Sequence, residues 1–164
     1  MEENLKTART THQVLLGLCG VYLLGLLAFE SKEEAVSNIT FLGFKLGNEA
    51  AFTLILGVAF LLTALRLCVY LEHIQKLPKS DDDYDLITKF PWILLFDDKH
   101  KMATILSWVE TVAMLIVGYN IGHVLCQATP WIGVPYILIL LVLFVCGLVE
   151  VHGITEDARR WTQE

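Results

Sequence analysis

The sequence predicts an all-α integral membrane protein, an antiparallel bundle of four transmembrane helices with both termini in the cytosol. Of its 164 residues, 55% are hydrophobic and only 18% are charged, whereas about a quarter of an average soluble domain is charged. The charges also avoid four stretches of about 20 residues, the length that a helix needs to cross the hydrocarbon core. We therefore expect a single membrane domain over residues 1–164, with the lipid bilayer as its main partner.

The first predicted span covers about residues 11–29 and contains the run VLLGLCGVYLLGLLAF. Lys6 and Arg9 precede it, as in a secretory signal peptide, but no small-residue cleavage site follows, so we expect a retained helix. In the outer loop, residues 30–49, the segment ITFLGFKLGN alternates and contains two glycines. This pattern favours a hairpin-like or interfacial segment.

The other predicted spans cover about residues 50–71, 102–126 and 131–150. The second and third contain one charge each, and the fourth is apolar on every side up to Val149. A helix of a soluble bundle would keep one polar face, so this pattern indicates lipid-facing helices. We expect Tyr136, with Trp131, to anchor the outer end of the last span at the interface.

The basic residues predict the orientation. Nine lie in the N-terminal tail, the loop after the second span and the C-terminal tail, against two in the loop after the first span. Cytosolic segments carry the excess of Lys and Arg, so both termini and the loop of residues 73–101 are expected in the cytosol. We expect a bacterial inner membrane or a plasma membrane rather than an organelle.

The cytosolic loop contains the acidic run DDDYD, followed by the apolar segment 86–96. This segment is too short to cross a bilayer and contains Pro91, so it either lies at the membrane interface or docks another protein. The acidic run lacks the glycine and glutamate that a calcium loop needs. The candidate docking residues for a soluble partner are Asp81, Asp82, Asp83, Asp85, Trp92 and Phe96.

Two charged residues, Arg66 and Glu110, fall inside predicted spans, where such residues are candidates for function. They lie at similar depth on consecutive helices, so we expect an ion pair with Thr63, Tyr70 and Ser107 nearby. The pair could fasten the two helices together or line a pore. Arg66 could instead extend its side chain to the inner interface.

A GxxxG pattern occurs in the third span, at Gly118 and Gly122. It permits close helix contact, either within the bundle or between subunits. Asn120 lies between the two glycines and could form hydrogen bonds across helices.

No catalytic motif is present in the sequence, its cysteines lack CxxC spacing, and its histidines lack the spacing of metal ligands on one helix. We therefore expect no cofactor and no metal. A net charge of −6 argues against a nucleic-acid partner. The pattern favours a homo-oligomeric membrane subunit that docks a soluble cytosolic partner. The alternatives are an oligomeric channel lined by spans two and three, and a small membrane enzyme acting on a lipid-like substrate.

Overall fold

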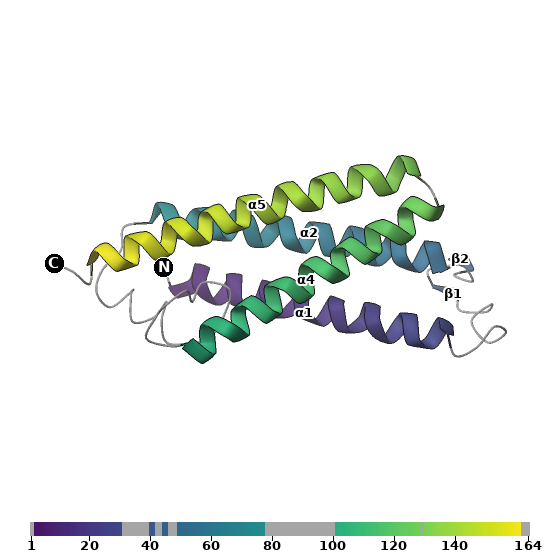
Figure 1. Cartoon of the computed structure of the whole chain (residues 1–164), viewed down its shortest axis with the longest axis horizontal. Coiled ribbons are helices and arrows are strands. Elements are labelled where there is room, and N and C mark those ends of the chain that lie inside the picture. The colour runs from purple at the N-terminus through teal and green to yellow at the C-terminus, as the bar shows by residue number, and fades with distance from the viewer. Residues whose placement is uncertain are drawn as a thin grey trace.

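The computed structural model describes residues 2–30, 40–41, 44–45, 49–77, 101–128 and 130–161. Each of four helices in this part of the chain is long and apolar enough to cross a membrane, as expected for a helical multi-pass membrane protein (Figure 1). The helices are α1 (Glu2–Glu30), α2 (Glu49–Lys76), α4 (Lys101–Ala128) and α5 (Pro130–Trp161).

The helices are longer than the apolar spans within them. In hydrocarbon every backbone N–H and C=O must be paired internally, which a helix achieves within one segment. α1 begins at Glu2, where acidic side chains of the first turn favour the positive end of the helix dipole. α5 begins at Pro130, a first-turn position where the missing N–H costs nothing.

Two short strands lie between α1 and α2. β1 (Thr40–Phe41) and β2 (Phe44–Lys45) pair in an antiparallel register that places Thr40 opposite Lys45. This pairing agrees with the hairpin-like interpretation of the alternating residues.

The core is built from one face of each helix. Buried residues recur mostly at intervals of three, four or seven, as expected for a helix with one inward face. α2 and α4 each pack against the other three helices, so these two helices form the centre of the bundle. The largest fully buried apolar and aromatic side chains are Tyr22, Phe60, Leu71, Ile74, Ile121, Leu125 and Ile154.

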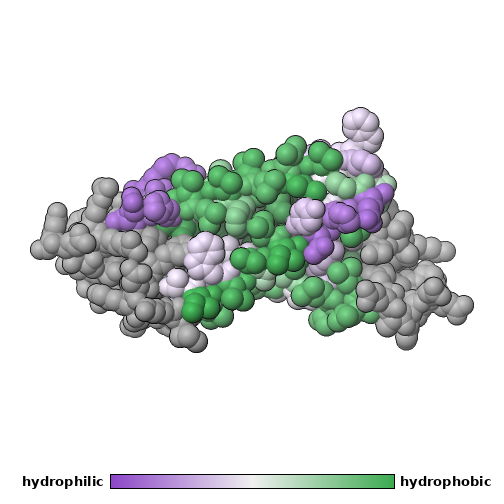
Figure 2. All heavy atoms as spheres, in the orientation of Figure 1, coloured by the Kyte–Doolittle hydropathy of each residue, from purple (hydrophilic) through white to green (hydrophobic). Residues whose placement is uncertain are grey.

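Apolar side chains also cover the outward faces of the helices (Figure 2). A surface of this kind suits lipid rather than water. Trp131 at the start of α5 is 92% exposed, as an interfacial anchor would be. Tyr136 is only 5% exposed, so its expected role as a second anchor is wrong. It lies one turn from Leu140 on the inward face of α5.

Candidate functional site

Glu110 of α4 faces His12 of α1 inside the bundle. Nε2 of His12 lies 3.7 Å from Oε2 of Glu110, and their side chains are 4% and 25% exposed. This distance allows electrostatic attraction when the imidazole is protonated but is too long for a good hydrogen bond. Nε2 of His12 is buried and has no hydrogen-bond partner among the described residues. The intramembrane acid therefore contacts the N-terminal helix.

Arg66 is not brought to Glu110. Among the described side chains no ion pair joins the two, and the guanidinium carbon of Arg66 instead lies 5.6 Å from the ring centroid of Tyr70. Arg66 shares the outward face of α2 with Leu62 and Val69, which are exposed. The pair was expected because the two residues lie at similar depth. The next residue, Leu67, faces the core, and a helix turns by about 100° per residue, so Arg66 points away from the core.

The predicted hydroxyl residues divide between these two places. Ser107, almost fully buried, lies one turn before Glu110. The hydroxyl of Thr111 donates to the Ser107 carbonyl oxygen at 2.7 Å. Thr63 lies near Arg66 and donates to the Ala59 carbonyl oxygen at 2.7 Å. The five residues expected to form one polar group thus belong to two separate groups.

His12 is a functional candidate that the sequence alone did not indicate, because its histidines lack the spacing of metal ligands on one helix. It shares the inward face of α1 with Ala8, Leu15 and Cys19, all buried. This spacing of four, three and four residues is the signal that could have identified it.

The two glycines of the GxxxG pattern pack against α5 within the bundle. A Cβ atom on Gly118 would lie 2.9 Å from a methyl carbon of Leu140. On Gly122 it would overlap Cγ1 of Ile137. Of the two alternatives for this pattern, the structure shows the contact within one chain. Asn120 lies on the opposite, exposed side of α4.

A line of polar side chains interrupts the apolar outward face of α4. Figure 2 shows hydrophilic side chains among apolar ones over the half of α4 that leads to α5. Asn120 lies eight residues before the end of the helix, a rise of about 12 Å. The rings of Tyr119 and His123 have centroids 6.3 Å apart. This polar stripe consists of Tyr119, Asn120, His123 and Gln127, which are all exposed.

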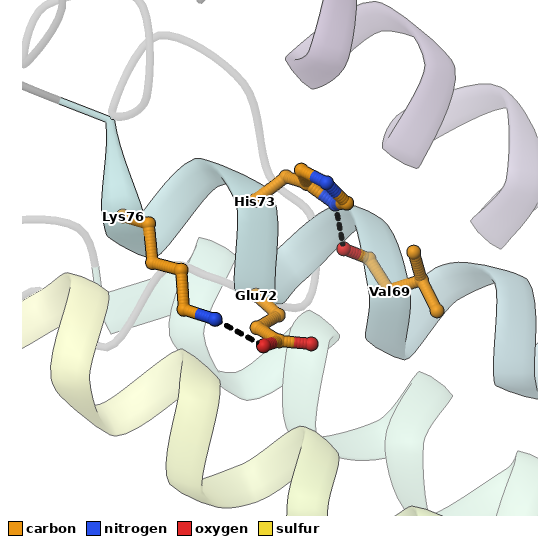
Figure 3. Close-up of polar contacts among 4 residues, drawn as sticks. All are labelled: Val69, Glu72, His73 and Lys76. Atoms are coloured by element: carbon orange, nitrogen blue, oxygen red, sulfur yellow. Dashed lines mark hydrogen bonds and ion pairs between the residues drawn. The ribbon is translucent and has the colours of Figure 1, made fainter.

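Polar groups at the end of α2 are paired within their own helix (Figure 3). Lys76 forms an ion pair with Glu72. Nδ1 of His73 lies 2.7 Å from the carbonyl oxygen of Val69, to which it can donate when protonated. Within the described ranges, no group of three or more His, Cys, Asp and Glu side chains could hold a metal ion.

The six docking residues predicted in the cytosolic loop lie outside the described residues, as does the segment 86–96. The described candidates are therefore the His12–Glu110 pair, the surroundings of Arg66 and the polar stripe of α4. No protein-family model, curated protein or solved structure matches the chain.

Proposed function

We propose that the protein is a membrane-embedded subunit that forms a homo-oligomer through α4 and docks a soluble partner on its cytosolic face. The observation that carries the first part is the exposed position of Asn120 within the polar stripe of α4. An amide without a hydrogen-bond partner costs roughly 2–7 kcal/mol in an apolar environment. A second helix that covers the polar stripe removes this cost.

The chemistry of the amide favours a second copy of the same chain. Asn120 offers two N–H donors and one carbonyl acceptor, so two such side chains can satisfy each other. A two-fold axis through this face of α4 brings the same residue of both copies together. Gly118 and Gly122 are already used within the bundle, so the contact depends on the polar side chains rather than on the glycines.

The cytosolic docking surface depends on the orientation of the bundle. In Figure 1 the start of α1 and the end of α5 lie at the same end of the molecule. This placement supports an antiparallel arrangement with both ends on one side of the membrane, and the excess of basic residues favours the cytosol. The acidic and aromatic residues between α2 and α4 would then face a soluble partner. Impermeant labelling of the ends of α1 and α5 tests the required orientation.

The contact between Glu110 and His12 bears on the alternative of a channel. A pore lined by spans two and three would use Arg66 and Glu110 from several subunits. Glu110 instead faces α1 of its own chain. This position favours a structural subunit over a pore.

The oligomer is tested by replacing Asn120 with Leu. Native mass spectrometry of the purified protein in mild detergent should show a dimer or larger assembly. Asn120→Leu should weaken its association about tenfold, because interhelical hydrogen bonds in membranes contribute about 0.6–2 kcal/mol each.

Gln13→Leu is the matched control, since it removes an exposed amide from α1 without touching α4. This variant should assemble like the wild type. A monomeric wild type, or an Asn120→Leu variant that assembles equally well, would contradict the proposed contact.

A further inference from the structure

A polar cavity of about 120 Å³ lies between α1 and α2. It contains Arg66, the one charged residue of the predicted second span (residues 50–71), and it lies apart from the polar stripe of α4. Its wall consists of Thr7, Thr10, Thr11, Val14, Thr63 and Arg66.

The α1 residues in the cavity wall indicate where the cavity lies along the predicted first span. On α1 the cavity wall changes from three threonines to the half-exposed Val14, which opens the apolar run of the helix. Arg66 lies about 15 Å before the end of α2 by helix rise, but its neighbours across the cavity are these polar residues. Since the predicted first span begins at about residue 11, the cavity lies across the expected inner end of that span.

The charge of the cavity is positive. Arg66 is exposed, and no carboxylate among the described side chains lies within ion-pair distance of it. Its guanidinium lies over the Tyr70 ring, a contact that leaves the N–H groups at its edge available. A planar guanidinium binds phosphate oxygens with two parallel hydrogen bonds.

The threonines line the rest of the cavity with hydrogen-bond acceptors. Each hydroxyl donates to the carbonyl oxygen four residues earlier: Thr7 to Glu3, Thr10 to Lys6, Thr11 to Thr7 and Thr63 to Ala59, at 2.7–2.9 Å. Their protons are therefore used within the helices, and the remaining lone pairs act as acceptors. Arg66 supplies donors while the threonines supply acceptors.

We propose that this cavity binds a phospholipid whose headgroup contains hydrogen-bond donors in addition to the phosphate. The phosphate binds Arg66, the hydroxyl or ammonium groups of the headgroup donate to the threonines, and the chain-bearing glycerol end lies against Val14. Phosphatidylglycerol and phosphatidylethanolamine have both parts, whereas the choline of phosphatidylcholine has no donor. Positively charged sites between membrane helices are suited to such headgroups.

Lipid titration followed by native mass spectrometry tests the site. The purified protein in detergent is titrated with each of the three lipids, all with identical acyl chains. Phosphatidylglycerol and phosphatidylethanolamine should bind about tenfold more tightly than phosphatidylcholine, the effect of one or two additional hydrogen bonds. Equal binding of all three lipids would overturn the proposal.

Three variants separate the parts of the site. Arg66→Gln should weaken phosphatidylglycerol binding about tenfold, and Arg66→Lys should do so less, because it keeps the charge and loses the planar fork. Thr10→Val should reduce the preference over phosphatidylcholine about threefold, since one acceptor is lost. Lys76→Gln, a control that removes a charge already paired with Glu72, should bind like the wild type. Unchanged binding by Arg66→Gln would overturn the site.

Inorganic phosphate distinguishes a lipid from a soluble anion. Addition of millimolar phosphate should leave the bound phosphatidylglycerol in place, because the free anion lacks the donors and the chains. Displacement of the lipid would overturn the lipid assignment in favour of soluble phosphate. The Arg66 variants should leave the oligomeric state unchanged, so failure of this site is distinguishable from failure of the α4 contact.

Discussion

The buried imidazole of His12 attracts the carboxylate of Glu110 when the imidazole is protonated. An ionised carboxylate within a membrane is costly unless an opposite charge or hydrogen-bond donors surround it. His12 comes from a different helix, so the same contact also holds α1 against α4. Removal of either partner leaves the other in an apolar interior, which is more damaging than loss of the attraction alone.

A double-mutant cycle tests this contact. His12→Ala and Glu110→Ala should each destabilise the protein, and the double variant should lose less than the sum of the two effects. The coupling expected for residues in direct contact is about 0.5–3 kcal/mol. The measurement is unfolding in mixed micelles of sodium dodecyl sulfate, followed by tryptophan fluorescence.

The matched cycle combines Arg66→Ala with Glu110→Ala. Because the structure separates these two side chains, their coupling should be close to zero. A strong coupling in this second cycle, together with none in the first, would restore the ion pair expected from the sequence.

The helices themselves could be predicted from the sequence, whereas their rotational positions could not. The bilayer sets the length of a span, so the charge-free stretches locate it directly. The inward face of such a helix is poorly marked, because the outward face is also apolar. For this reason the depths of Arg66 and Glu110 could be estimated from the sequence. The sequence did not reveal that Arg66 faces outward whereas Glu110 faces α1.

The same ambiguity affected the GxxxG pattern of α4. Its spacing established that Gly118 and Gly122 share a face. Whether that face packs against α5 or against another subunit became clear only from the position of α5 in the structure. Asn120, between them, necessarily lies on a different face. The sequence thus placed the two glycines on one face of α4 without identifying the helix that they pack against.

The close contact of α4 with α5 predicts a marked effect of Gly122→Ala. The new methyl group would overlap Cγ1 of Ile137, which can move only if this stiff, β-branched side chain changes its χ1 rotamer or its helix shifts. Overpacking of this kind costs about 1–3 kcal/mol. Gly118→Ala should cost less, because the flexible end of Leu140 can turn away.

Gly17→Ala is the control within α1, where nothing lies within 4 Å of the added methyl group. Alanine favours a helix over glycine by up to about 1 kcal/mol, so this variant should be neutral or slightly more stable. Thermal unfolding in detergent measures all three variants. Equal destabilisation at Gly17 and Gly122 would contradict the described packing.

At the scale of the whole molecule, three polar features lie at different positions on an apolar bundle. The His12–Glu110 pair lies inside, the cavity of Arg66 opens between α1 and α2, and the polar stripe of α4 lies nearer α5. The proposed partner helix at α4 and the proposed lipid at Arg66 would therefore use different surfaces. The orientation of the bundle determines toward which side of the membrane the polar stripe and the Arg66 cavity lie.

The orientation predicts where an impermeant thiol reagent can reach the protein. In a background without native cysteines, Glu3→Cys and Glu156→Cys place thiols near the start of α1 and the end of α5. Gln127→Cys places one at the opposite end, where α4 meets α5. In right-side-out vesicles a maleimide should label position 127 and reach the other two only after permeabilisation, because the proposed orientation keeps the basic segments in the cytosol. Labelling of positions 3 and 156 from outside would reverse the orientation and place the docking loop away from cytosolic proteins.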